Sequence, residues 1–340
     1  AVCLTTAGAG AINLLTGIAQ FHQDRLNPRI LERHFARLGA EKVFASNTRD
    51  SLQVSFSKNR REFYTFALSQ AAGGDSRIES RIDNLFSLTN LLDDEIERNF
   101  LAALFVSLTN RALDRDLRSY KAVSDSAVQF DTEINEFRLD TYLQVTYRSD
   151  DGKQTASTRI SYAERDEAHR AKFPGSTSPS IEILFNARNR QEQTKDNLSR
   201  RTAVAGTFGC PLSLSDFFSV SGTASMLRYD TPSELNVEDR DELLTAVTIM
   251  TSHHFSQPLD LSFTLDGILS HVVYLLKERS ANNNYNRILR FSPRAGYRPF
   301  RNLISINTFE VLANYTVYDF EQQVALVRSF SYRQFGWIDS

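Results

Sequence analysis

Residues 258–274 read PLDLSFTLDGILSHVVY, and the alternation within this stretch decides the fold class. Most of the large apolar side chains share one parity: Leu259, Leu261, Phe263, Leu265 and Leu269, with Ile268 and Val272 as exceptions. The polar side chains share the other parity: Asp260, Ser262, Thr264, Asp266 and Ser270. Successive side chains of a β-strand point to opposite faces, so this pattern predicts a strand with one apolar and one polar face. The stretch is also much longer than a usual strand of about 5–6 residues.

Similar alternation recurs along most of the chain after residue 50. It is clearest over Glu133–Arg148 and Ile288–Arg298, where apolar residues take turns with charged or polar ones. Short turns such as residues 150–152 (DDG) alternate with longer polar stretches such as Lys277–Asn284. Outer-membrane barrels have the same asymmetry, with short periplasmic turns and longer outside loops. We therefore predict an all-β fold, an antiparallel transmembrane β-barrel of roughly 14–16 strands, which is wide enough for a lumen.

Other segments predict different elements. Residues 27–28 (NP) are a typical helix start, and apolar residues follow at near-helical spacing, so we expect one short helix over about residues 28–44. Ile181–Ala187 alternates and predicts a strand, whereas Glu164–Pro179 and Asp93–Glu97 are expected to be polar loops. Residues 1–50 would then form an N-terminal segment that carries the helix, and residues 51–340 would form the barrel.

Composition limits the classes of function. The chain has 39 basic and 41 acidic residues, so no excess of positive charge favours a nucleic-acid partner. No run of 18 apolar residues is present, which argues against a transmembrane helix. A mean hydropathy of −0.34 remains compatible with a membrane barrel, because only every second residue of its strands faces lipid.

Several segments carry a resemblance to a known group of proteins. They are NPRILERHFARLG (27–39), EFRLDTYLQ (136–144), NVEDRDELL (236–244), ERSANNNYNRILRFSPR (278–294), NTFEVLANYTVYDFE (307–321) and RSFSYRQFGWIDS (328–340). With these segments the chain resembles large, mostly uncharacterised outer-membrane β-barrel proteins of Bacteroidota, Chlorobi and Ignavibacteria. The resemblance implies a signal peptide, an antiparallel barrel and a place in the bacterial outer membrane, and it supplies no catalytic residues.

Both ends of the chain depart from that group. The chain begins without a basic leader segment, and it ends in WIDS (337–340) where a terminal aromatic residue is expected for the last strand of a barrel. We expect a segment of a longer protein, so the barrel over residues 51–340 need not be complete at either end.

The two faces of the predicted strands give the candidate site residues. Five arginines on the polar parity form a candidate lumen-facing basic stripe: Arg290, Arg294, Arg298, Arg138 and Arg148. Five residues on the apolar parity are expected to face lipid: Leu259, Leu261, Phe263, Leu265 and Leu269. The stripe would select anions if the lumen were open. Alternatively, it would pair with acidic residues such as Asp140, Asp260 and Asp266. Near-zero net charge favours the paired interior over a wide pore.

Other chemistry finds little support in the sequence. His253 and His254 would face opposite sides of a strand, and the acidic Asp93–Glu97 reads more simply as a solvated loop than as a calcium site. No GxSxG segment is present, so a barrel-rim hydrolase is a minor alternative, and we expect no enzyme, cofactor or metal. Expected partners are outer-membrane lipid and other outer-membrane or periplasmic subunits. The alternative from another class is a soluble all-β structural protein, such as a capsid, fibre or surface-layer subunit.

Overall fold

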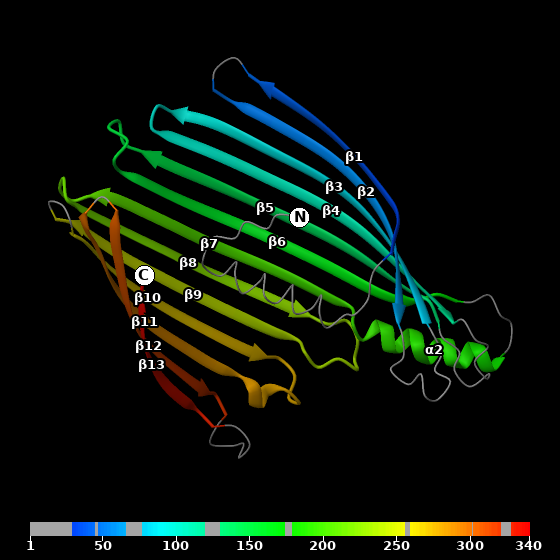
Figure 1. Ribbon diagram of the computed structural model, residues 1–340. Coiled ribbons are helices and arrows are strands. Elements are labelled where there is room, and N and C mark those ends of the chain that lie inside the picture. Colours follow the sequence, from blue (N-terminus) through cyan, green and yellow to red (C-terminus); the bar gives the residue numbers. More distant parts are fainter. Residues whose placement is uncertain are drawn as a thin grey trace.

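The computed structural model describes residues 29–44, 47–65, 77–119, 130–173, 179–255, 259–300, 302–320 and 328–340. These residues form a single 13-stranded antiparallel sheet in which neighbouring strands follow one another in chain order (Figure 1). The first strands are β1 (Arg29–Val43), β2 (Arg49–Thr65), β3 (Arg77–Glu97), β4 (Phe100–Ser119), β5 (Thr132–Arg148) and β6 (Thr155–Ala171). The helix α2 (Pro179–Gln193) follows, and then β7 (Asn197–Pro211), β8 (Asp216–Asp230), β9 (Arg240–His254) and β10 (Leu259–Tyr274). A short helix η2 (Ser280–Asn282) precedes β11 (Asn284–Phe300), β12 (Leu303–Tyr318) and β13 (Phe330–Asp339).

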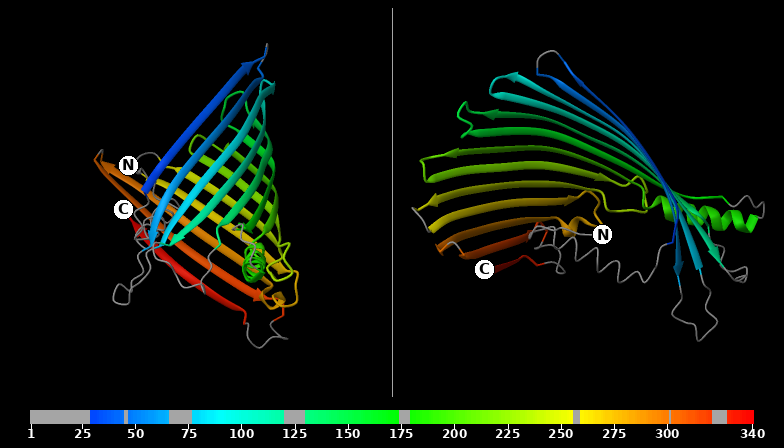
Figure 2. Two further views of the ribbon diagram at one scale, coloured as in Figure 1. Left: turned by 90° about the vertical axis from the view of Figure 1, so that its right-hand side faces the viewer. Right: turned by 45° about the horizontal axis from the view of Figure 1, so that its top comes forward.

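The sheet is strongly twisted and curved, so that it has a hollow side and an outer side (Figure 2). Its edge strands are β1 and β13, and within the described ranges no pairing joins them. Because the number of strands is odd and all neighbours are antiparallel, β1 and β13 run in the same direction. The sheet is thus a curved wall rather than a closed barrel.

The connections differ sharply between the two ends of the sheet. At one end, which we call the short-turn end, the connections are residues 44–48, 98–99, 149–154, 212–215, 255–258 and 301–302. At the opposite end, the long-connection end, they are residues 66–76, 120–131, 172–196, 231–239, 275–283 and 319–329. The predicted alternation of tight turns and longer connections is confirmed, and every long connection lies at the same end.

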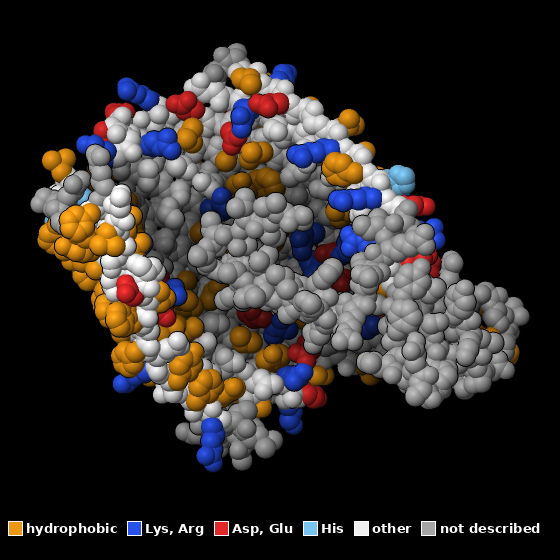
Figure 3. Space-filling model, viewed as in Figure 1, with side chains coloured by type: hydrophobic (Ala, Val, Ile, Leu, Met, Phe, Trp, Pro, Cys, Tyr) orange, Lys and Arg blue, Asp and Glu red, His pale blue; other side chains and the backbone are white. Residues whose placement is uncertain are grey.

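Register sorts the side chains of the whole sheet into two faces, because residues directly opposite one another on neighbouring strands share a face. Asp266 lies opposite Thr248 on one side and Arg290 on the other, whereas Leu265 lies opposite Ile249 and Phe291. The hollow side carries the face to which Asp266 and Arg290 belong. In Figure 3, charged side chains gather within the hollow, and hydrophobic side chains lie along the margin formed by β11–β13. We call these the concave face and the convex face.

The sheet is a single layer with almost no hydrophobic core. Among the described residues, the buried apolar side chains are Leu113, Phe130 and Ala171, all near the long-connection end. Large apolar side chains of the convex face remain exposed, for example Leu289 at 53% and Ile160 at 53%. A soluble monomer rarely exposes a continuous apolar surface of this kind, so the convex face requires a covering of lipid or protein.

Several predicted elements are confirmed. The opening stretch is β10, and the segments predicted around residues 133–148 and 288–298 are β5 and β11. The turn at residues 150–152 joins β5 to β6, with Gly152 at a φ of +69°. The Asp151 carboxyl group accepts one hydrogen bond from the Ser149 hydroxyl and one from the backbone N–H of Lys153. The bond from Ser149 is the larger cause of a lowered pKa of Asp151, and the bond from Lys153 is the second.

The helix predicted over residues 28–44 is wrong, because Arg29–Val43 is strand β1. This segment pairs with β2 along its length, from Val43 opposite Arg49 to Arg29 opposite Glu62. An isolated helix of that length is marginal in water, and Gly39 lowers its propensity further, so the ladder of backbone hydrogen bonds to β2 prevails. Residues 27–28, the predicted helix start, lie outside the described residues.

Three further predictions of local structure are wrong. The alternating residues 181–187 belong to helix α2, where Pro179 occupies the first helical position and Phe185 contacts Phe130 and Phe173 with ring centroids 5.7 and 5.1 Å apart. Asp93–Glu97 ends strand β3, and residues 164–171 continue strand β6. In both cases the neighbouring strands supply backbone partners that a polar sequence does not reveal. The described strands number 13, against the 14–16 expected, and they do not close.

The turn at Gly152 gives a first test. Alanine at position 152 would have to adopt the left-handed backbone conformation, which costs about 1–2 kcal/mol for an L-residue. We expect Gly152→Ala to lower the free energy of unfolding by about that amount, measured by denaturant titration in lipid vesicles. Gly267→Ala is the control, because a Cβ at Gly267 would meet nothing within 4 Å and the backbone there is extended. Equal losses in both variants would contradict the assigned turn.

Candidate site on the concave face

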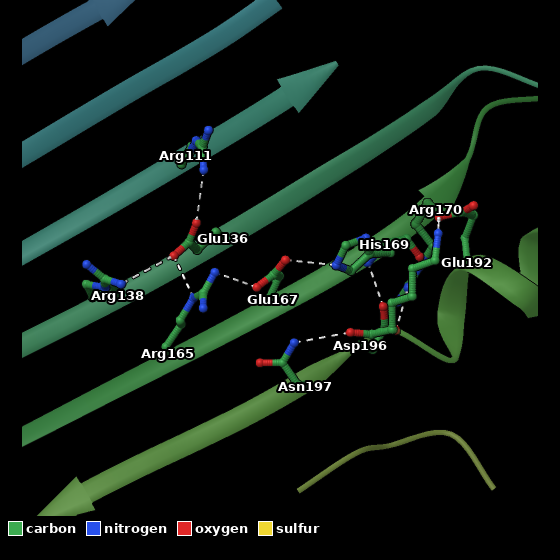
Figure 4. Close-up of polar contacts among 11 residues, drawn as sticks. Arg111, Glu136, Arg138, Arg165, Glu167, His169, Arg170, Glu192, Asp196 and Asn197 are labelled. Carbon is green, nitrogen blue, oxygen red and sulfur yellow. Dashed lines mark hydrogen bonds and ion pairs between the residues drawn. The ribbon is translucent and has the colours of Figure 1, made fainter. Parts of the chain in front are cut away.

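The most strongly charged part of the concave face lies on β3–β6. Register places Arg111 of β4 opposite Glu136 of β5, and Glu136 opposite Glu167 of β6. Arg138 of β5 lies directly opposite Arg165 of β6. Basic and acidic side chains from consecutive strands therefore meet on one surface, which we call the arginine–glutamate cluster (Figure 4).

Glu136 is the centre of the arginine–glutamate cluster. Its carboxylate accepts a hydrogen bond from Arg165 Nε at 2.7 Å, and it lies 3.6 Å from Arg111 Nη1 and 3.8 Å from Arg138 Nη2. The Glu136 side chain is only 12% exposed, so the three guanidinium groups replace most of its water. A carboxylate that is this shielded requires cationic partners, because desolvating it alone is costly.

Two of the three arginines, Arg111 and Arg165, also have a second carboxylate within reach. Arg111 donates two hydrogen bonds to Asp83, at 2.9 and 2.8 Å, and this doubly bonded geometry is the strong form of an arginine–carboxylate pair. Arg165 Nη2 lies 2.6 Å from Glu167. Three arginines and three carboxylates thus neutralise one another across four strands.

The network continues toward the long-connection end and reaches helix α2. Glu167 Oε1 lies 2.9 Å from His169 Nε2, and the backbone N–H of His169 donates to Asp196 at 2.6 Å. Arg170 donates to the other oxygen of Asp196, also at 2.6 Å. In α2 the nearly buried Glu192 lies between Arg188 and Lys195, at 2.7 and 2.6 Å. These bonds fix the end of β6 and the chain after α2 as one polar unit.

Lys172 anchors the same end of the sheet on the other face. Its Nζ atom lies 2.7 Å from Asp114 and 3.5 Å from Asp116. Burial alone would lower the pKa of Lys172, but the hydrogen bond and charge of Asp114, with help from Asp116, outweigh it and raise the pKa above its ordinary value. Lys172 therefore stays charged near neutral pH.

The five arginines of the predicted basic stripe differ in their surroundings. Arg290 donates from Nε to Asp266 at 2.8 Å, and Asp266 also accepts from the Thr248 hydroxyl at 2.6 Å. Glu310 is 4.0 Å from the same guanidinium. Asp266 is 9% exposed, so its carboxylate is well shielded from water, whereas the Arg290 side chain is 44% exposed. Arg290 therefore has the acidic partner that the sequence suggested.

The other predicted arginines differ from Arg290. Arg294 and Arg298 have the parity of Arg290 and line a pocket of about 460 Å³ with Asp260 and His254, but no ion pair holds them within the described part of the chain. Arg138 joins the cluster around Glu136. Arg148 ends β5 at the short-turn end, opposite Thr155, and is likewise without an ion pair among the described residues. The structure therefore places the five arginines in three separate regions of one face.

The residues expected to face lipid lie together on the convex face. Within β10 they alternate with the residues of the concave face, and Phe263, Leu265 and Leu269 are 38–41% exposed. The ring of Phe263 is stacked with that of Phe291 on β11, with centroids 6.3 Å apart. Contact of these side chains with lipid itself stays a prediction.

The polar groups near the short-turn end do not form a nucleophile–base pair. The Ser213 hydroxyl donates to Asp216 at 2.5 Å, and His253 Nδ1 lies 2.6 Å from the same aspartate. The aspartate thus stands between serine and histidine, whereas activation of a serine requires the histidine in the middle. The hydrogen bond from Ser213, and then the one from His253, lower the pKa of Asp216.

The described residues hold neither an arrangement of metal ligands nor a membrane-spanning helix. No group of three or more histidine, cysteine, aspartate or glutamate side chains there is arranged to hold a metal ion. No helix in those same ranges has the length and apolarity that crossing a membrane requires.

Sequence reasoning missed most of the arginine–glutamate cluster. Glu167 and His169 lie in the segment predicted to be a polar loop, Glu164–Pro179, and no site was predicted at Arg111. Residues 163–169 read AERDEAH and carry charge on both parities, so local alternation gave no signal for the longer β6.

Comparisons with known proteins give only distant likenesses. No family model matches the chain, and no curated protein matches it. Among solved structures, an outer-membrane channel from Pseudomonas putida F1 is similar at 9% identity and a TM-score of 0.31, over 87% of this chain and 94% of that one. A bacterial polysaccharide outer-membrane secretin is similar at 9% identity and a TM-score of 0.27, over 84% of this chain and 92% of that one.

The difference between Arg290, which pairs with Asp266, and Arg294 gives the second test. Arg290→Met leaves the shielded Asp266 carboxylate without its cation, so we expect the free energy of unfolding in lipid vesicles to fall by about 1–3 kcal/mol. Arg294→Met, four residues along the same face of β11, removes a guanidinium that has no ion pair, and we expect a change within about 0.5 kcal/mol. Similar values for the two variants would show that the Arg290–Asp266 pair contributes nothing particular.

Proposed function

We propose that this chain forms the wall of a bacterial outer-membrane β-barrel, with its convex face in lipid and its concave face toward the interior. The observation that carries the proposal is an uncharged band on the convex face. On β5 it runs from Phe137 to Tyr147, on β9 from Leu243 to Thr251, and on β11 from Leu289 to Tyr297. A tilted strand needs about 9–11 residues to cross the hydrocarbon region, which is the length of these bands.

Charged side chains flank this band on the convex face. Toward the long-connection end they include Glu133 on β5, Asp241 on β9 and Arg287 on β11. Toward the short-turn end Asp216 lies on β8 beside the band. A charge at mid-bilayer would cost about 2–4 kcal/mol, so confinement of charges to the two margins is expected of a lipid-facing surface.

The lengths of the connections suggest an orientation. Outer-membrane barrels have short turns on the periplasmic side and longer loops outside. We therefore propose that the long-connection end, with α2, faces the exterior. The resemblance to outer-membrane proteins of Bacteroidota, Chlorobi and Ignavibacteria, and the expected partners, outer-membrane lipid and further outer-membrane or periplasmic subunits, belong to the same proposal.

We further propose that the interior is charge-paired rather than a wide pore. The arginine–glutamate cluster and the Arg290–Asp266 pair neutralise most of the charge on the parts of the concave face where they lie. The role would then be structural, in surface assembly, or in transport of a selected solute, and the unpaired Arg294 and Arg298 leave room for the last of these.

Spin labelling tests the membrane assignment. In a Cys3→Ser, Cys210→Ser background, a nitroxide at Leu265→Cys should collide more often with oxygen than with a water-soluble nickel chelate in bilayers. The matched variant Thr264→Cys, one residue away on the other face, should show the opposite preference. Ile249→Cys and Met250→Cys repeat the comparison on β9.

The soluble alternative makes a different prediction for the same variants. If the convex face packs against another protein sheet, the label at Leu265→Cys will be inaccessible to both reagents, and the chain will be extracted by alkaline carbonate without detergent. That pair of results would overturn the membrane assignment.

Conductance tests the charge-paired interior. We expect the protein to give no large, stable conductance in planar bilayers, because paired side chains project from the interior wall. A large anion-selective conductance that disappears in Arg294→Glu, with folding retained, would show that the interior is instead an open basic pore.

A further inference from the structure

A second group of arginines lies on the concave face, closer to the long-connection end. Arg61 of β2 is directly opposite Arg81 of β3, and Arg81 is directly opposite Arg115 of β4. These three residues, which we call the arginine row, are not part of the predicted basic stripe. They lie near the strand ends that adjoin the connections at residues 66–76 and 120–131.

Directly opposed like charges destabilise a sheet. Neighbouring strands are about 4.8 Å apart, so the three arginines occupy a span of about 10 Å across β2–β4. Carboxylates, water or a bound anion relieve repulsion of this kind. Whether carboxylates do so here depends on where the nearby carboxylates lie and on what they contact.

The carboxylates at neighbouring positions already have cationic partners, and one of these partners is Arg81 itself. Glu79 accepts a hydrogen bond from Arg81 Nε at 2.5 Å, and Asp83 is held by both bonds from Arg111. Asp114 and Asp116 flank Arg115 in the sequence, but they have the parity of the convex face and contact Lys172.

Arg61 and Arg115 consequently have no ion pair among the described residues. The Nε atom of Arg115 is buried and has no hydrogen-bond partner, which is costly for a charged donor. The row therefore has unused hydrogen-bonding capacity of the kind that binds oxyanions.

The central arginine is already positioned. The guanidinium carbon of Arg81 lies 4.5 Å from the centre of the Phe63 ring, and Glu79 holds its Nε atom. A cation held against an aromatic face and a carboxylate keeps its remaining N–H donors in fixed directions. Less entropy is then lost when an anion binds.

We propose that the arginine row binds a multivalent oxyanion, a molecule that carries two or more phosphate or sulfate groups. Arginine presents a rigid fork of donors that matches such groups, and rings of arginine serve the same purpose in anion-selective pores. A single phosphate would reach only part of a row about 10 Å wide, whereas linked groups would engage Arg61 and Arg115 together. The placement at the outer mouth of the interior rests on the proposed function, but the binding itself does not.

Calorimetry on the detergent-solubilised full chain tests the site with two probes. Inorganic tripolyphosphate represents a free anion, and a sulfated tetrasaccharide represents anions carried on a glycan; the tighter binder identifies the source. Orthophosphate should bind at least about tenfold more weakly than either, because it loses one arginine. Failure of both probes to bind, or equal affinity for orthophosphate, would overturn the proposal.

A matched pair of double variants separates the row from general positive charge. Arg61→Gln with Arg115→Gln should weaken binding about a hundredfold, that is, about tenfold for each lost charged hydrogen-bond partner. Arg294→Gln with Arg298→Gln removes two other unpaired arginines of the same face and should leave the affinity unchanged. Equal losses in the two double variants would refute a specific site.

A measurement on the unaltered protein guards against misfolding of the variants. Phenylglyoxal modifies accessible arginines, and bound tripolyphosphate should protect Arg61 and Arg115 but not Arg294 in peptide mapping. Protection of all three, or of none, would count against the arginine row. The spin-label test at Leu265→Cys is independent of the ligand, so failure of the membrane assignment and failure of this site are distinguishable.

Discussion

Backbone pairing between neighbouring strands along most of their length is the interaction on which the rest of the structure depends. From Thr132 opposite Ala171 to Arg148 opposite Thr155, β5 and β6 pair without a register shift. In lipid there is no water to satisfy a free backbone group, so pairing of this extent is what a membrane-spanning sheet requires. A slip of one residue would move Arg138 to the convex face and Leu139 to the interior, and both moves would be costly.

The ion pairs of the concave face depend on the same register. Arg111 reaches both Asp83 and Glu136 because β3, β4 and β5 place them in adjacent positions, and Arg290 reaches Asp266 for the same reason on β10 and β11. Backbone pairing and charge pairing thus favour one register together. The register also brings like charges together, both at Arg138 opposite Arg165 and in the arginine row. In the row, however, Arg61 and Arg115 have no ion pair among the described residues, and this is a reason to look for a ligand.

Because the sheet is a single curved layer, its stability depends on what covers it. With few buried apolar side chains in the described ranges, the sheet gains little from a core of its own, and the exposed convex face must gain its stabilisation from what covers it. The two edges are comparable, because β1 and β13 each offer one row of backbone groups and run in the same direction. A direct junction between them would be parallel, and an antiparallel one would need one more strand.

The sequence by itself determined the strands whose two faces differ in polarity, such as β5, β10 and β11, because a period of two is written into each segment locally. It also determined the tight turn at Gly152. It did not determine β1 or the helical state of residues 181–187, where local pattern gave one answer and pairing with β2, or packing of Phe185 against Phe130, decided another. The sequence suggested an acidic partner for Arg290, but only the tertiary structure decided that Arg294 would have no ion pair among the described residues. The physical reason is that charges attract across strands, and which residues face each other is set by the register between strands, which no single segment encodes.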